Sequence, residues 1–178
     1  MALKLTRTER WILANQCRIL EALYPKEARD FARDREALEH GFEGAYSDII
    51  PHIYDESEGL SAEECSEVVQ IMDMHLALKR SYEALADKSG IKEYGIKFQG
   101  FDGNNETAQM AYARFYCSQG GGMDRGDDFN SHGPELDVYR RMMKVWQGMG
   151  KSHELTREQI IKILAARVHP SRRGEAEG

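Results

Sequence analysis

Apolar residues recur at steps of three and four along most of this chain, which is the period of an amphipathic α-helix. The first apolar stripe contains Trp11, Ile12, Ile19, Leu20 and Leu23. It follows Thr6-Arg7-Thr8-Glu9, which has the spacing of a capping box, where the threonine and glutamate side chains bond free amides at a helix start. The pattern predicts a helix from Thr6 to about Tyr24.

The same period predicts two further helices and one short element in the first half. A helix should run from Lys26 to His40, where Gly41 is placed to end it. A short element surrounds 46–54. A second capping box, Ser61-Ala62-Glu63-Glu64, opens a helix over 61–86. That helix would be about 38 Å long at 1.5 Å per residue, so we expect it to form one arm of a hairpin or an oligomer face.

The second half alternates between turns and helices. Apolar and polar residues partly alternate at 92–98, which allows at most one short strand there. Asn104 or Asn105 is expected to cap a helix that runs to Tyr116 or Cys117. Residues 119–133 have the composition of a loop, and a helix from Pro134 to Trp146 follows it. A third capping box, residues 156–159, opens a final helix to about Arg167.

These elements predict an all-α protein of six to seven helices, with a long helical hairpin joined to a second compact helical unit. We expect one domain over 1–168, with sub-units 1–90 and 91–168, and a disordered tail over 169–178. The hydrophobic share of 41% and the charged share of 30% are typical of globular proteins. No apolar run approaches the roughly 20 residues that cross a bilayer, and the start of the chain lacks the apolar segment of a secretory signal. The expected location is the cytoplasm.

Charge is unevenly distributed along the chain. The net charge is -6, but residues 25–67 carry four Lys/Arg and thirteen Asp/Glu, whereas residues 140–178 carry nine and four. The acidic whole disfavours general binding to polyanions, and the basic C-terminal third leaves nucleic-acid binding as an alternative. Three widely spaced cysteines, Cys17, Cys65 and Cys117, form no CxxC pair and lie among apolar residues, so we expect buried free thiols.

The loop before the last two helices contains one metal-binding pattern. Its oxygen-bearing residues fall at positions one, five, seven and twelve of a calcium-loop spacing: Asp124, Asp128, Asn130 and Glu135. Position three is Gly126, which has no side-chain oxygen, and position six is Phe129, where the sharp turn of such a loop needs glycine. The residues are therefore more typical of a loop that caps the next helix, with a bound cation as the alternative.

The same loop contains one catalytic pattern. Arg125 and His132 are separated by six residues, a spacing compatible with the Arg-x(4–6)-His motif of helical ribonucleases of the HEPN group. In such a site histidine transfers protons and arginine stabilises phosphate charge, and Arg114 on the preceding helix could contribute. The intervening segment carries two acidic residues, Asp127 and Asp128, which would repel phosphate. No fingerprint of a zinc protease, a P-loop, a serine hydrolase or a dinucleotide site is present.

Several segments together resemble the YfbU family of small bacterial helical proteins. The segments that carry the resemblance are Trp11–Gln16, Ile71–Met74, Gly100–Asp102, Tyr112–Phe115, Phe129–His132, Tyr139–Met142 and Lys144–Trp146, followed by the repeat of the final helix over 155–165. The resemblance implies an all-helical fold built from a helical hairpin and a second helical unit. It supplies no catalytic residues to carry over. The QGGG segment at 119–122 and the basic tail differ from the family pattern.

The sequence therefore favours a cytoplasmic helical protein that acts by contact with another protein and is not an enzyme. Its partner is not named by any motif, and wide apolar helix faces make a homodimer a further expectation. No cofactor or metal is expected. The first alternative is an RNA-cleaving or other hydrolytic, toxin-like enzyme that uses the 119–133 loop with Arg114, Arg125 and His132. The second alternative is nucleic-acid binding through the basic C-terminal third.

Overall fold

The computed structural model describes residues 3–49, 59–123, 128–169 and 171. In that part of the chain it contains eight α-helices, one 3₁₀ turn and no strand, so the predicted all-α fold is confirmed. Two of the eight helices, α3 and α5, are single turns of four residues, which leaves six longer ones. The chain divides into two compact units, Met1–Ser57 and Glu58–Gly178.

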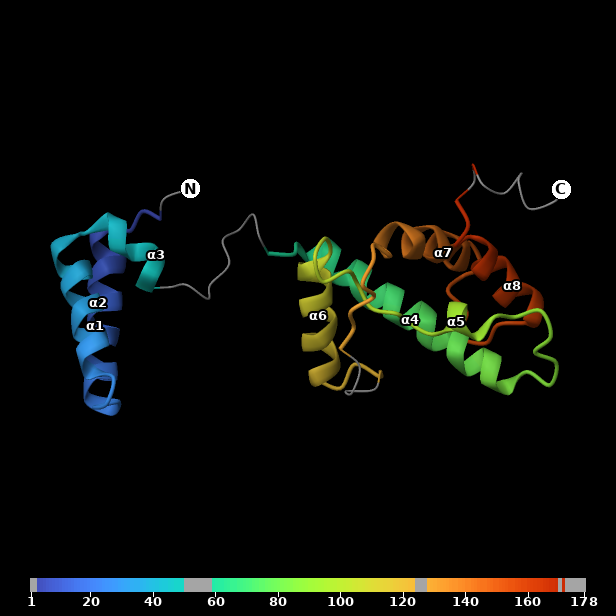
Figure 1. Ribbon diagram of the computed structural model, residues 1–178, viewed down its shortest axis with the longest axis horizontal. Helices are drawn as coiled ribbons and strands as arrows, with labels where there is room; N and C mark the ends of the chain where they lie inside the picture. Colours follow the sequence, from blue (N-terminus) through green and yellow to red (C-terminus); the bar gives the residue numbers. More distant parts are fainter. Residues whose placement is uncertain (1–2, 50–58, 124–127, 170, 172–178) are drawn as a thin grey trace. The chain divides into compact units, whose positions relative to one another are not determined.

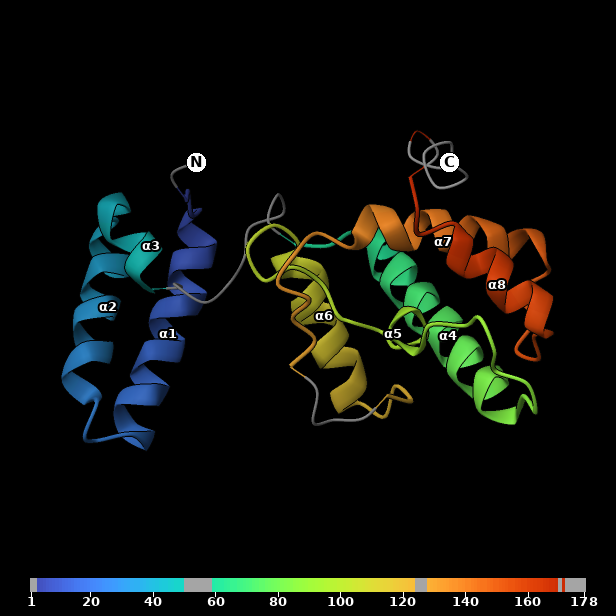
Figure 2. The same cartoon turned by 45° about the vertical axis from the view of Figure 1, so that its right-hand side comes forward.

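The first unit is a helical hairpin (Figure 1, Figure 2). Its helices are α1, Arg7–Leu23, and α2, Ala28–His40, followed by the turn η1, Glu43–Ala45, and the short helix α3, Tyr46–Ile49. Both bonds of the predicted capping box are present, because the Glu9 amide donates to Oγ1 of Thr6 and the Thr6 amide donates to a carboxylate oxygen of Glu9. Gly41 ends α2 with a positive φ of 76°, as its position predicted.

The core of the hairpin is small. Its fully buried members are Ala14, Cys17, Leu38 and Tyr46. Two ion pairs join α1 and α2. Nε of Arg35 lies 2.7 Å from Oε1 of Glu21, and Nη2 of Arg18 lies 2.8 Å from Oε1 of Glu39. A core of this size accommodates only part of the apolar surface of α1: Leu13 packs against it, but Trp11 and Leu23 are exposed.

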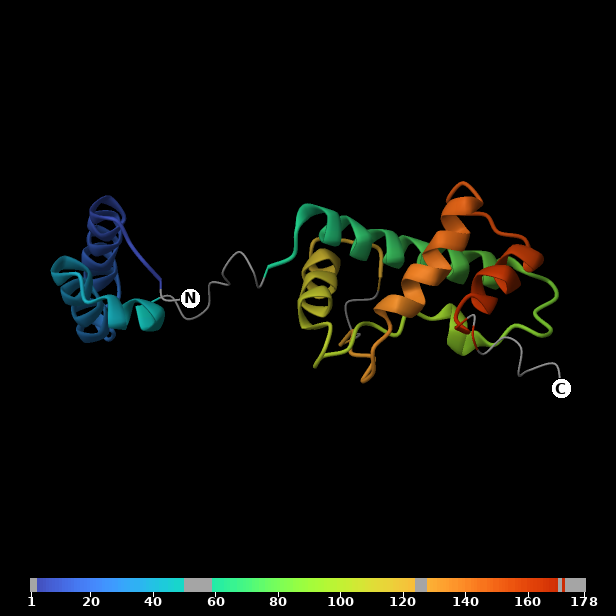
Figure 3. The same cartoon turned by 90° about the horizontal axis from the view of Figure 1, so that it is seen from above.

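The second unit is organised around its longest helix, α4, Ala62–Ala84. The other elements are α5, Glu93–Ile96; α6, Thr107–Ser118; α7, Leu136–Gly148; and α8, Arg157–Ala165. All four contact α4. Figure 3 shows α6 against the first part of α4 and α7 crossing it. The capping boxes at Ser61 and Thr156 both form as predicted.

The long helix α4 is a central helix and not a hairpin arm. It buries side chains on more than half of its circumference: Val68, Ile71, Met72, Met74, His75, Ala77, Leu78 and Ser81. The buried surface of this helix is therefore wider than a single amphipathic face. The predicted sub-units divided the chain at residue 90 and so grouped this helix with the N-terminal hairpin. The compact units divide instead between Ser57 and Glu58, because α4 packs on the helices that follow it.

The segment 92–98 contains a helical turn, α5, and no strand, which agrees with the prediction of at most one short strand. Its Gly95 is buried, and a Cβ added there would lie 3.1 Å from Leu164, so the turn packs closely on α8. Neither Asn104 nor Asn105 caps α6, whose N-cap residue is Glu106. The Asn105 side chain donates instead to the carboxylate of Asp102, which also accepts from the Asn104 amide.

Candidate functional site

In the second unit, the loop segment Gly100–Asp102 is hydrogen-bonded to the loop segment Phe129–His132. Phe101 and Asn130 form an isolated bridge, in which the Phe101 amide donates to the Phe129 carbonyl at 2.9 Å and the Ser131 amide donates to the Phe101 carbonyl at 3.1 Å. Gly100 makes this approach possible, because a Cβ there would lie 2.1 Å from the Phe129 backbone. Its φ of +92° also favours glycine.

Side chains of the same loop complete this contact. Oδ1 of Asn130 accepts from the amides of Gly103 and His132, at 3.1 and 3.0 Å. Oδ1 of Asp128 accepts from the Asn130 amide at 3.1 Å. The bonds from the His132 and Asn130 amides are bonds of turns, in which short polar side chains replace backbone partners, whereas the bond from the Gly103 amide joins residues 27 positions apart. Phe129 itself is buried, so the loop is anchored in the core by an aromatic ring.

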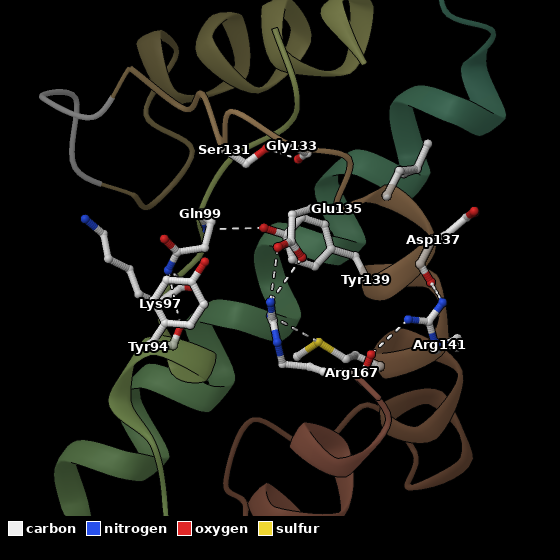
Figure 4. Close-up of polar contacts among 12 residues, drawn as sticks. Tyr94, Lys97, Gln99, Ser131, Gly133, Glu135, Asp137, Tyr139, Arg141 and Arg167 are labelled. Atoms are coloured by element: carbon white, nitrogen blue, oxygen red, sulfur yellow. Dashed lines mark hydrogen bonds and ion pairs between the residues drawn. The ribbon is translucent and has the colours of Figure 1, made fainter. Parts of the chain in front are cut away.

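Glu135, the last residue of the calcium-loop pattern, belongs to a different cluster. Its carboxylate is 3.1 Å from Nη2 of Arg167, and both side chains are largely buried. Figure 4 shows the two groups pointing toward each other beside Tyr139, whose hydroxyl donates to the Gly100 carbonyl and accepts from the Gln99 amide. Burial is the main reason that the pKa of Tyr139 is raised above its ordinary value. This cluster connects α7 to Arg167, which follows α8, and to the backbone at Gly100.

The calcium-loop hypothesis therefore stays a prediction. Asp124 lies outside the described residues, and the described members Asp128, Asn130 and Glu135 have partners in two separate places. Among the described residues, no group of three or more His, Cys, Asp or Glu side chains lies close enough to hold a metal ion.

The catalytic pattern is only partly within the described chain. Arg125 lies outside it. Arg114 donates from Nε to the Asp128 carbonyl at 2.7 Å, so its guanidinium holds the loop to α6. His132 is exposed and has a positive φ of 55°, and its charge helps to hold the pKa of Asp102 below its ordinary value after the larger effect of hydrogen bonds from Asn105 and Asn104. The three residues as a catalytic set stay a prediction.

Glu106 has a role that the sequence pattern did not indicate. Only 7% of its surface is exposed, and its carboxylate accepts from the amides of Glu135 and Leu136, at 3.0 and 2.8 Å, and from the Asp102 amide at 2.9 Å. The first two amides begin α7. A carboxylate at that end satisfies free donors and has a favourable interaction with the helix dipole. Glu106 therefore caps a helix about thirty residues away in sequence.

The second unit contains a cavity of about 550 Å³ beside His75. Its walls come from the second half of α4, from the segment around α5, and from Gly122 and Met123. His75 is 1% exposed and its Nδ1 lies 3.0 Å from the Ile96 carbonyl, so Nδ1 carries the proton and donates. Its Nε2 has no hydrogen-bond partner among the described residues. No sequence motif pointed to His75; the available signal was its position among the apolar residues of α4.

The first unit has one exposed apolar face. Five large apolar side chains at or near α1 are at least 46% exposed: Trp11, Ile12, Ile19, Leu23 and Tyr24. On the other side of α1, Ala14 and Cys17 face the core, where burial raises the pKa of the Cys17 thiol. Cys117 is also buried and Cys65 is half-buried, so the expectation of buried thiols holds fully for two of the three cysteines.

Comparison with known proteins identifies the family that the fold and motifs resemble. The model of the YfbU domain matches residues 3–166. A UPF0304 protein of Methanocaldococcus jannaschii is 35% identical over 172 residues, which cover 91% of this chain and 99% of that protein. A UPF0304 protein of Actinobacillus succinogenes is 32% identical over 168 residues, which cover 92% and 100%. The first relative is archaeal, so the likeness extends beyond the bacterial proteins expected from the sequence.

Within the residues that the structure describes, no helix is both long enough and apolar enough to span a membrane.

Proposed function

The chain belongs to the YfbU family, and we propose that it is a cytoplasmic, non-enzymatic interaction protein that associates with a second copy of itself through α1. The observation that supports this proposal is the exposed face of α1. Trp11 is 67% exposed, Ile19 is 59% exposed and Leu23 is 64% exposed. Apolar residues of this size gathered on one helix face are typical of an interaction surface.

The α1 face is continuous, and the Arg18 guanidinium borders it, because its Nη1 donates to Oδ1 of Asn15 at 3.3 Å. At about 100° per residue, the positions that share an arc of roughly 140° with Trp11 are spread over the whole helix. They are Thr8, Trp11, Ile12, Asn15, Gln16, Ile19, Ala22 and Leu23. The charged residues of α1 fall outside this arc. A solvated helix face in a chain with 30% charged residues would be expected to carry charge, so this face has the composition of a buried one.

A second copy of the same helix fits this face. In a symmetric dimer each surface meets itself, which requires that it carry no like charges that would repel. Two α1 helices that pair antiparallel about an axis at the level of position 17 would place Trp11 of one copy opposite Leu23 of the other. These positions are 12 residues apart, about 18 Å along the helix. The aromatic and aliphatic residues would then lie at both ends, with Ile19 and the amide side chains near the axis.

The alternatives have less support from the described geometry. Binding to nucleic acid needs available cations, yet the four arginines that the structure describes in the basic C-terminal third bond other parts of the protein. Arg140 pairs with Glu67, Arg141 donates to the Ala166 and Arg167 carbonyls, Arg157 donates to the Ser89 carbonyl and Arg167 pairs with Glu135. For RNA cleavage, Arg114 is similarly occupied by the Asp128 carbonyl. A protein that acts only by contact with another protein needs neither available cations nor a set of catalytic residues.

The oligomeric state of the full chain tests the proposal. Sedimentation velocity and light scattering over a range of concentrations should give a dimer for the wild type. Ile19→Glu would place two carboxylates near the symmetry axis, so the dissociation constant should rise at least about a hundredfold. The matched control is Ile161→Glu, which changes an isoleucine of α8 that is 38% exposed, and it should leave the dimer intact.

Two results would contradict self-association. One is a wild-type chain that stays monomeric at all concentrations. The other is a dimer that persists unchanged in Ile19→Glu. If Ile19→Glu lowers the free energy of unfolding of a chain that was already monomeric, the face is covered within one molecule, and the proposal is wrong.

A further inference from the structure

The cavity beside His75 has the features of a small-molecule site, independently of self-association. Its volume of about 550 Å³ lies within the roughly 300–1,000 Å³ range of ligand pockets. Apolar side chains form part of its walls: Leu76, Ile96, Phe98 and Met123. The ring of Phe98 is buried, and its centroid lies 5.5 Å from that of His75. Tyr82 adds a second aromatic ring to the lining. These surfaces suit a flat, apolar ligand body.

Beside this cavity, one ring nitrogen of His75 has no hydrogen-bond partner among the described residues. Because Nδ1 of His75 donates to the Ile96 carbonyl, Nε2 of the same neutral ring has a lone pair and can only accept. Burial holds the pKa of His75 at about 4, which keeps the ring neutral at physiological pH. A buried acceptor without a partner is unfavourable, and most such groups in proteins are satisfied. A ligand with an O–H or N–H group could supply the partner.

The rest of the lining carries charge. It contains three lysines, Lys79, Lys88 and Lys97, and two glutamates, Glu83 and Glu93. Lys88 places its Nζ 4.9 Å from the centre of the Tyr82 ring. The formal charges of these five side chains sum to +1, whereas the net charge of the whole protein is -6. A local excess of positive charge within an acidic protein favours a ligand that carries a negative charge.

We propose that this cavity binds a small aromatic acid, which donates a hydrogen bond to Nε2 of His75 and directs its carboxylate toward Lys79 and Lys88. The apolar walls would hold the ring. Each of the three features contributes a separate requirement: an aromatic body, one donor and one negative charge. A compound that lacks one of them should bind more weakly.

Three related compounds test the three requirements with the full chain. The first probe is 3-(4-hydroxyphenyl)propanoate, which has a ring, a donor and a carboxylate. The second, 3-phenylpropanoate, lacks the hydroxyl. The third, 3-(4-hydroxyphenyl)propan-1-ol, lacks the charge. Calorimetric titration should show that the first binds about five- to tenfold more tightly than either of the others, the usual effect of one hydrogen bond or one charge contact.

Two variants locate the binding. Lys79→Gln combined with Lys88→Gln changes only exposed side chains, and it should weaken binding of the first probe about tenfold without affecting the uncharged third probe. The matched control, Lys144→Gln combined with Lys162→Gln, changes exposed lysines of α7 and α8 that do not line the cavity. It should bind all probes as the wild type does.

A spectroscopic signal tests the hydrogen bond itself. In protein labelled with ¹⁵N-histidine, the Nε2 resonance of His75 is the one missing from a His75→Phe sample, and it should shift when the first probe binds but not with 3-phenylpropanoate. The proposal is overturned if no probe binds at millimolar concentration, if the hydroxyl gives no gain, or if the cavity lysines can be replaced without effect.

Discussion

The burial of His75 affects both its packing and its pKa. Its Nδ1 bonds the Ile96 carbonyl, and its ring contacts Phe98 and Tyr139, with centroids 5.5 and 5.0 Å away. Burial is the largest cause of its lowered pKa, and the positive charge of Arg167 adds to the effect. The residue is therefore fixed in its neutral form by both packing and charge.

The stability of the second unit should consequently fall in mild acid. In the unfolded chain the pKa of His75 is near its ordinary 6.5, whereas in the folded protein it is about 4. Between these values the unfolded state binds more protons, so the free energy of unfolding decreases as the pH falls from about 6.5 to 4. The full loss is on the order of 3 kcal/mol, at about 1.36 kcal/mol per pKa unit. Urea unfolding at a series of pH values measures it.

A comparison of variants isolates the contribution of His75. His75→Phe keeps a ring at this position and removes the titrating group, so its stability should depend less on pH over the same range. His40→Gln replaces an exposed histidine and serves as the control. An equal decrease of the slope in both variants would show that burial of His75 is not its cause.

Residue-scale features were predictable from the sequence where they are local. The capping boxes at Thr6, Ser61 and Thr156 each join residues three positions apart, and all three form as predicted. Asn104 and Asn105 have the right residue type for a cap, but Asp102 binds them instead. The role of Glu106 depends on amides 29 and 30 positions away, so no local pattern could indicate it.

At the scale of elements, α7 depends on that distant carboxylate. The helix has no side-chain cap of its own, because its N-cap residue Glu135 makes no capping bond and pairs with Arg167. The predicted helix began at Pro134 and ended at Trp146, while the observed one is Leu136–Gly148. The helix was thus found from its period, but the group that satisfies its first amides was not.

Replacing Glu106 should destabilise the second unit. In Glu106→Gln the amide group has one acceptor oxygen, and its NH₂ would face backbone donors that now bond a carboxylate. The free energy of unfolding should decrease by about 1–3 kcal/mol, as expected for charged hydrogen bonds at a buried helix start. Urea unfolding followed by circular dichroism measures this. The control Glu154→Gln changes an exposed glutamate and should stay within about 0.5 kcal/mol of the wild type. Equal stability of both variants would contradict the capping role.

At the same scale, the segment 92–98 shows where periodicity alone leaves the conformation open. Its partial alternation allowed a strand, and strands need partners along the backbone. Within the described residues, the isolated bridge of Phe101 and Asn130 is the place where two segments pair. The buried residues Ile96 and Phe98 instead pack toward α4 from a helical turn and the loop after it. Tertiary packing decided the conformation.

At the scale of the whole molecule, the two compact units have separate cores. Leu38 belongs to the core of the hairpin, and Leu78 belongs to the core around α4. The sequence indicated both helical units, but it grouped the long helix with the wrong neighbours, since an apolar stripe does not say which helices will cover it. Only the buried surface of α4 on several sides reveals its central position.

Separate cores predict separate unfolding. Leu38 and Leu78 are 1% and 0% exposed, so replacing either by alanine should cost about 2–5 kcal/mol. Substitutions in separate cores are expected to act independently. In hydrogen-exchange mass spectrometry, Leu38→Ala should therefore accelerate exchange in α1 and α2 and leave α4, α7 and α8 unchanged. Leu78→Ala should have the reverse effect. Faster exchange throughout the chain in both variants would show that residues 1–168 unfold as one domain, and that the two cores depend on each other.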